Sequence, residues 1–484
     1  MVDVGRPVLG RAGVTGLVVA TTVAMRLRYL WTPISSDEAG YLAVARAWSR
    51  GARLYDTIWI DRQEGLLLLF RAIHSLGLGS PVGVRLLAIG AAVVAALSIG
   101  GICAALGGER ARLYGAISAA VLLGIGQFEG FEANAELLSG AIGAGGLALA
   151  LCWRDRNRLW PLFGAGLVSG LALMTKQSAF DTLLVALATL AWRWRRAPGA
   201  GGWKRLTVYA GGVATTVGLA MLHGALTGWR RWWFAFARYR LTYRSVFSNP
   251  DWPSLSITAG MAIPIVLPAV LVTVAGFELY RRQITVEAWV TLMGWLAAAM
   301  LSFVLGGLFF RHYWMILMFP LSALVGIAAS RAPRVTVRLG ALLVALAVPL
   351  WSSVRLMTVP ARRLGTELGD RRWTTDTTVG HWIRQHTASH HEQVLVLCNG
   401  VGLYGNIDSD PPFPYLWQLH LNDIPGARQL LAETMTKPDR PRFAALYNDL
   451  RWCDPSGRSA AALASNYHEV VRIDFVRIFE RNTG

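Results

Sequence analysis

The first 356 residues contain eleven strongly apolar runs separated by short polar loops, and this pattern restricts the fold more than any other feature. A helix that crosses a bilayer needs about 20 mostly apolar residues. With 54% hydrophobic residues overall, the chain is expected to be a polytopic α-helical membrane protein with about 11 transmembrane helices. The expected spans are 13–33, 82–105, 113–128, 137–152, 160–175, 179–192, 206–224, 256–276, 287–306, 313–330 and 338–355.

No run of this length follows, so we predict a membrane domain at 1–357 and a soluble domain at 358–484. The soluble part alternates between helical and strand-like patterns, which is typical of a small α/β domain. It is expected to contain helices at 375–388, 425–435 and 459–467, and strands at 394–398, 443–447 and 470–480. The loop at 34–81 is expected to carry interfacial helices, as is the aromatic and arginine-rich segment 228–253, which is either an aromatic belt or a docking surface for an anionic head group.

Arginine and lysine are more frequent in alternate loops if the N-terminus is cytoplasmic. The positive-inside rule then predicts a multi-pass protein of the cell membrane with an extracytoplasmic C-terminal domain. In that compartment Cys398 and Cys453 could form a disulfide, a pairing that the sequence leaves open.

The net charge of +18 lies in the membrane domain, and there it points to anionic lipid or a phosphorylated ligand rather than to nucleic acid.

The first polar loop begins with Asp37-Glu38, directly after an apolar run. Acidic residues at a membrane face are costly to bury and usually functional. An equally good interpretation is a helix N-terminus, where both carboxylates cap the helix and oppose its dipole. The sequence alone leaves both interpretations open.

Five segments with unusual polar residues fall on the same side of the membrane in this topology. Each has an ordinary alternative: a solvated helix face for the glutamates, a lysine that reaches toward water, or an interfacial anchor. Together they supply carboxylates that can take a proton and cations that can hold a phosphate. The segments contain Asp37 and Glu38; Asp61 and Arg62; Glu132 and Glu136; Lys176 and Gln177; and Arg311 and His312.

The motif DEAGYLAVARAW after the first span resembles the first-loop signature of the GT-C polyprenyl-phosphate glycosyltransferases. The branch it resembles most is family 39, with protein O-mannosyltransferases and the aminoarabinose transferase. Asp61-Arg62 resembles a second motif of that branch, although Gln63 and Glu64 replace its prolines. NAELL, LALMTKQSA and RHYWMILMFPLSAL resemble later motifs, and VLVLCNGVGLYG with PYLW resembles the extracytoplasmic α/β domain of actinobacterial members.

The resemblance, which covers essentially the whole chain, implies a transferase that moves a sugar from a polyprenyl-phosphate lipid to a glycan, lipid or protein acceptor. It implies Asp37 as general base, with Glu38 orienting the acceptor or holding a metal. Donor phosphate would be bound by Arg62, Lys176 and Arg311. Substrate contacts would come from Asp61, Glu132, Glu136, Gln177 and His312.

The expected donor sugar is arabinofuranose or mannose, built into a cell-envelope glycan with inversion of the anomeric centre. No cofactor is certain, and a divalent cation remains an open alternative because carboxylates can form a hard oxygen site. The alternative functions are a transporter or flippase of a lipid-linked sugar, or a scaffold without catalysis. A transporter would predict matching halves and broken helices, and neither is evident in the sequence.

Overall fold

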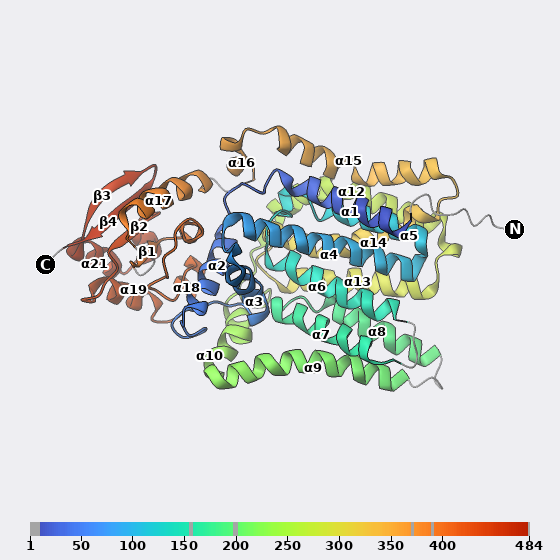
Figure 1. Cartoon of the computed structure of the whole chain (residues 1–484), viewed down its shortest axis with the longest axis horizontal. Helices are drawn as coiled ribbons and strands as arrows, with labels where there is room; N and C mark the ends of the chain where they lie inside the picture. The colour runs from blue at the N-terminus through green and yellow to red at the C-terminus, as the bar shows by residue number, and fades with distance from the viewer. Residues whose placement is uncertain (1–9, 154–157, 197–201, 369–371, 389–391, 483–484) are drawn as a thin grey trace.

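The structure is a computed structural model that describes residues 10–153, 158–196, 202–368, 372–388 and 392–482. Each of the eleven apolar runs overlaps one helix of a single bundle (Figure 1), although the expected spans 13–33 and 113–128 continue past the ends of their helices. The bundle helices are α1 (Arg11–Leu27), α4 (Pro81–Gly107), α5 (Glu109–Leu122), α6 (Ala135–Cys152), α7 (Trp160–Thr175), α8 (Asp181–Arg196), α9 (Gly202–Thr227), α12 (Trp252–Leu279), α13 (Val286–Leu305), α14 (Met315–Arg331) and α15 (Val335–Thr358).

Seven helices in the described part of the chain are long and apolar enough to cross a membrane, by length and composition alone. The expected number of about 11 spans therefore remains a prediction. Helix α5 has only 14 residues, which at 1.5 Å per residue gives about 21 Å, short of a bilayer core of about 30 Å. Helix α14 is almost entirely buried, so it forms the centre of the bundle.

Short helices connect the bundle at the end that faces the C-terminal domain. Helix α3 (Glu64–Ile73) packs on α2 (Ser36–Ser49) and α7, and it buries Leu66, Leu67 and Phe70. The arginine-rich segment forms α10 (Trp229–Trp233) and α11 (Tyr239–Tyr243), joined by one π-helical turn. Figure 1 shows α2, α3 and α18 (Gln418–Asp423) between the bundle and the C-terminal sheet, whereas α1 begins at the opposite end.

The C-terminal part is the expected α/β unit around a four-stranded sheet of order β1-β2-β4-β3. Strand β1 runs parallel to β2, and the other neighbours are antiparallel. The strands are β1 (Val394–Leu397), β2 (Phe443–Leu446), β3 (Tyr467–Ile473) and β4 (Val476–Arg481); the helices are α16 (Ala361–Glu367), α17 (Trp373–His386), α18, α19 (Ala427–Thr436), α20 (Leu450–Cys453) and α21 (Arg458–Asn466).

The prediction of one strand at 470–480 is wrong, because the chain turns back there. Asp474 has a φ of 52°, and Ile473 pairs with Val476 across the tight turn. The segment therefore forms the hairpin of β3 and β4. Hydrophobic alternation continues through the turn residues, which hides this turn in the sequence.

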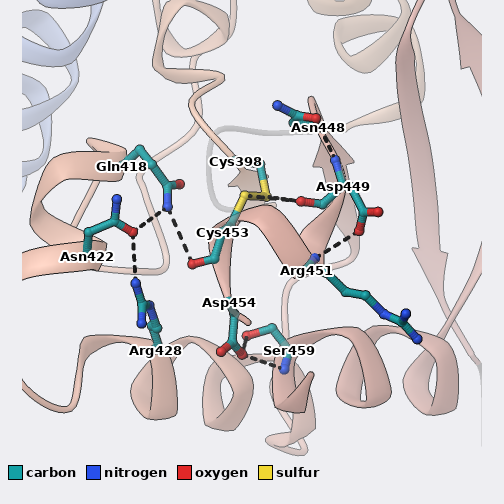
Figure 2. Close-up of a disulfide and its surroundings, with 10 residues drawn as sticks. All are labelled: Cys398, Gln418, Asn422, Arg428, Asn448, Asp449, Arg451, Cys453, Asp454 and Ser459. Carbon is teal, nitrogen blue, oxygen red and sulfur yellow. Dashed lines mark hydrogen bonds between the residues drawn. A yellow bond between two sulfur atoms is a disulfide. The ribbon is translucent and has the colours of Figure 1, made fainter. Parts of the chain in front are cut away.

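A disulfide joins Cys398, which follows β1, to Cys453 at the end of α20 (Figure 2). The sequence left this pairing open. It ties together two loops at the same edge of the sheet, 55 residues apart in the chain.

Candidate functional site

A cavity of about 430 Å³ lies where the C-terminal domain meets the end of the bundle. Four segments of the bundle end and four segments of the C-terminal domain line it. The lining residues are Ser36, Asp37 and Tyr41 of α2; Ile60, Asp61 and Arg62; Tyr239, Arg240 and Arg244; Leu308 and Phe310; and Arg372, Asn399, Trp417, Gln418, Leu419, His420, Asn422 and Trp452.

Asp37 faces this cavity from the first turn of α2. Its Oδ1 accepts a hydrogen bond from the indole Nε1–H of Trp417 at 3.0 Å, and its Oδ2 accepts one from the hydroxyl of Tyr41 at 3.2 Å. Neither of these two partners is charged. Trp417 and Tyr41 fix the direction in which the carboxylate points.

Glu38, the next residue, points away from the cavity and is fully buried. It completes a capping box with Ser35, which confirms the capping interpretation for this residue. Its carboxylate also accepts hydrogen bonds from Arg85 Nη1 at 2.7 and 2.8 Å and from the backbone N–H of Ala133 at 2.7 Å. All of its acceptor positions are in use, so the structure gives Glu38 a structural role in place of the predicted catalytic one.

No three His, Cys, Asp or Glu side chains among the described residues are grouped so that they could hold a metal ion. A pair of Asp37 and Glu38 does not fit a shared cation, since Glu38 is paired to Arg85. The carboxylate set therefore does not fit the divalent cation that the sequence left open.

Asp61 joins three positively charged or polar groups from distant parts of the chain. Its Oδ2 lies 2.9 Å from Arg62 and 2.5 Å from Arg240, and its Oδ1 lies 3.2 Å from Nε2 of His420. Burial by itself would raise the pKa of Asp61, but Arg240, Arg62 and His420 outweigh burial and hold it well below its usual range. Asp61 is therefore ionised and orients both arginines along the cavity wall.

The arginine group has a net positive charge even after these ion pairs. Arg244 is held by Asp423 through two contacts of 2.7 Å, whereas Arg62 and Arg240 share the single carboxylate of Asp61. The Nε–H of Arg62 is buried without a hydrogen-bond partner among the described residues. A group of arginines with guanidinium N–H donors left over after their ion pairs can bind a phosphate.

Lys176 lies behind the cavity, in a second cluster. It forms an ion pair with Glu136 and sits 4.4 Å above the ring of Tyr313. His312 Nδ1 lies 2.6 Å from Glu129, and its Nε2 lies 3.7 Å from Glu136. Lys176, Glu136 and His312 lie in one cluster, but they do not line the cavity.

Three further predicted residues also lie outside the cavity lining. Arg311 donates to the backbone carbonyl of Leu368 at 2.8 Å, which anchors the segment leading to α17. Gln177 donates to the backbone carbonyl of Asp61 at 3.0 Å and so supports that loop. Glu132 is buried; burial first, and then the nearby carboxylates Glu129 and Glu38, raise its pKa well above its usual range. Among the phosphate ligands expected from the sequence, only Arg62 reaches the cavity.

Sequence reasoning missed Arg240, Arg244, Trp417 and His420. The two arginines belong to segment 228–253, for which a docking surface for an anionic head group was one of the two interpretations. Trp417 ends the PYLW motif, which was noted in the sequence only for its resemblance, and His420 lies in α18, where no local pattern marks it. They reach the cavity only because the C-terminal domain docks on α2.

No protein-family model and no curated protein matches the sequence. The chain is similar in structure to ArnT from Cupriavidus metallidurans bound to undecaprenyl phosphate, with a TM-score of 0.70 and 14% identity over 97% of this chain and 98% of that one. The apo state of that protein gives a TM-score of 0.66, with the same identity and the same coverage of both chains. The archaeal oligosaccharyltransferase AglB from Archaeoglobus fulgidus, in complex with an inhibitory peptide and a dolichol-phosphate, gives 0.57 and 13% identity over 94% of this chain and 72% of that one.

These similarities confirm the expected fold: a polytopic α-helical bundle with a C-terminal α/β domain.

Proposed function

We propose that this protein is a membrane glycosyltransferase that moves a sugar from a polyprenyl-phosphate donor to an acceptor hydroxyl. The observation that carries the proposal is one cavity lined by Asp37, whose hydrogen bonds within the described residues come from Trp417 and Tyr41, together with the arginines Arg62 and Arg240. The similar structures contain undecaprenyl phosphate in one case and dolichol-phosphate in another. Both lipids carry the phosphate that such an arginine group would bind.

In this reaction Asp37 takes the proton of the acceptor hydroxyl while its oxygen attacks the anomeric carbon. The bond between that carbon and the phosphate oxygen breaks, and its electron pair stays on the phosphate. Arg62 and Arg240 stabilise the negative charge that develops there. A single displacement of this kind inverts the anomeric centre. Asp61 keeps both arginines oriented through the reaction.

The donor sugar is expected to be arabinofuranose or mannose, and the reaction is expected on the extracytoplasmic side of the cell membrane. The positive-inside pattern of the loops and the disulfide between Cys398 and Cys453 support that side. The carboxylate arrangement predicts activity that does not need a divalent cation, because Glu38 is engaged by Arg85.

The test is turnover by the full-length protein in vesicles that contain polyprenyl-phospho-arabinose or polyprenyl-phospho-mannose, with a short envelope glycan as acceptor. Release of lipid phosphate together with a lengthened glycan supports the proposal and identifies the sugar. A chelator in a parallel sample is expected to leave the rate unchanged. If both donors bind but neither is consumed, the protein is a transporter or a scaffold and the proposal is wrong.

A further inference from the structure

The two sides of the cavity are lined by different kinds of residue. The bundle side carries the charged groups, including Asp37, Asp61 and the arginines. The loops of the C-terminal domain contribute mainly uncharged indole and carboxamide groups. These are Asn399, Trp417, Gln418, Asn422 and Trp452, with Arg372 at the edge, where it donates to Ser36 and to the backbone carbonyl of Asn399.

Two of these residues are neighbours in sequence of the disulfide-bonded cysteines. Asn399 directly follows Cys398, and Trp452 directly precedes Cys453. Asn399 has a φ of 69°, so the chain turns sharply there. The bond between the sulfur atoms keeps the two lining residues on one rim, although they belong to segments far apart in the chain.

Hydrogen bonds attach α18 to the same rim, as Figure 2 shows. The amide nitrogen of Gln418 donates to the side-chain oxygen of Asn422 at 2.9 Å and to the backbone carbonyl of Cys453 at 3.4 Å. Arg428 donates to that same oxygen of Asn422 at 3.1 Å. The NH₂ group of Asn422 has no partner within the described part of the chain, so it can donate to a ligand.

Indoles and carboxamides recognise neutral polyols. An indole packs its flat apolar face on the C–H groups of a sugar ring, and a carboxamide both donates to and accepts from hydroxyl groups. An extended peptide would instead pair with the edge of a sheet, and none of the residues that line the cavity belongs to a strand. A lipid chain would need a continuous apolar surface, whereas the carboxamides of Asn399, Gln418 and Asn422 interrupt the two indoles of this rim.

We propose that the rim formed by Asn399, Trp417, Gln418, Asn422 and Trp452 is the acceptor subsite and binds a neutral saccharide. This inference rests on the proposed transferase function and specifies its acceptor. Trp417 belongs to the rim and also donates to Asp37, so a sugar on the rim has its hydroxyl beside the base. The charged half of the cavity is left for the donor phosphate.

The test measures glycan binding without any donor. Full-length protein in nanodiscs is mixed with a methyl mannotrioside or a methyl arabinofuranotrioside, and saturation transfer to the glycan protons is recorded by NMR. Trp452→Ala is compared with the conservative Trp452→Phe. The matched control is Phe475→Ala, an aromatic residue of similar exposure (45% against 54%) that lines a separate cavity in the same domain.

Saturation transfer to at least one glycan in the wild type is expected, with affinity reduced about 3–10-fold in Trp452→Ala and largely restored in Trp452→Phe. Phe475→Ala is expected to bind as the wild type does. The proposal would be overturned if Phe475→Ala lost glycan binding or if Trp452→Ala bound the glycan as tightly as the wild type does. It would also be overturned if the wild type showed no saturation transfer to either glycan.

A second arm distinguishes the acceptor from the sugar of the donor. Binding of the polyprenyl-phosphate sugars to Trp452→Ala is measured in the same nanodiscs, and no change is expected. Weaker donor binding with unchanged glycan binding would assign the rim to the donor sugar and overturn the proposal. Because the glycan measurement needs no turnover, its failure is separate from a failure of the transferase proposal.

Discussion

At the scale of single residues, Asp61 holds together the positively charged wall of the cavity, where we propose that the donor phosphate binds. Two arginines and a histidine from three distant segments meet on its carboxylate. Like charges so close would otherwise repel one another, and Asp61 offsets part of that repulsion. The remaining positive charge is what a lipid phosphate would meet.

The first prediction concerns Arg240, which sequence reasoning did not single out. Arg240→Gln should weaken binding of undecaprenyl phosphate about 10-fold or more, because a charge-assisted hydrogen bond is lost. Equilibrium binding to protein in nanodiscs measures this. Arg231→Gln is the control, since Arg231 lies in the same segment but pairs with Asp56 outside the cavity. Equal binding by Arg240→Gln and the wild type would remove Arg240 from the phosphate site.

The second prediction concerns His420, whose pKa is lowered from its ordinary value by burial, which outweighs the attraction of Asp61. Its Nδ1 is buried without a partner among the described residues, so a proton added there would have no acceptor. The unfolded chain binds this proton below about pH 6.5 and the folded chain only at lower pH. The free energy of unfolding should therefore fall as the pH drops below about 6.5.

Thermal unfolding in detergent between pH 7.5 and 5 measures this effect. His420→Gln keeps a donor for Asp61 but does not titrate, so its stability should fall less over the same interval. Parallel curves for the two proteins would contradict the role given to His420.

At the scale of elements, α2 joins the bundle to the C-terminal domain. Arg46 on α2 donates to the backbone carbonyls of Tyr404 and Ile407 at 2.6 and 2.9 Å. Six residues earlier on α2, Gly40 lets the ring of Trp417 lie directly against the helix backbone. Helix α2 thus carries Asp37 and also positions the residue that orients it.

The third prediction follows from this close contact. In Gly40→Ala the new Cβ would lie 2.3 Å from the Trp417 ring, so the ring must move away from Asp37. Alanine favours the helix itself, so a fall in turnover without unfolding of α2 is expected. Gly90→Ala in α4, where nothing lies within 4 Å, is the control. Unchanged turnover in Gly40→Ala would contradict the positioning role of Trp417.

The elements also show which parts of the site could be predicted from sequence. Long apolar runs are a local signal, so the eleven helices could be predicted, whereas the ion pair of Lys176 with Glu136 was not predicted and comes from the structure. Asp37 and Arg62 stood out because charge at a membrane face is unusual. The different fates of Asp37 and Glu38 depend on Arg85 and Trp417, which are distant in sequence and carry no local signal.

At the scale of the whole molecule, the C-terminal domain closes the cavity and is tied by its disulfide. A crosslink across 55 residues stabilises a fold by about 4 kcal/mol in the chain-entropy model.

The fourth prediction is that Cys398→Ser with Cys453→Ser lowers the melting temperature of the C-terminal domain. It should also raise the KM for the acceptor more than the KM for the donor, because Asn399 and Trp452 lose their fixed positions. Equal changes in both KM values would contradict this.

The measurement that tests the central claim most directly compares wild type with Asp37→Asn, using one donor in vesicles and recording donor binding and lipid phosphate release together. Asparagine keeps the shape and can still accept from Trp417, but it cannot take a proton. We predict donor binding within about twofold of the wild type and a loss of release of at least about 100-fold, in keeping with general base catalysis. Release by Asp37→Asn at the rate of the wild type would contradict the account.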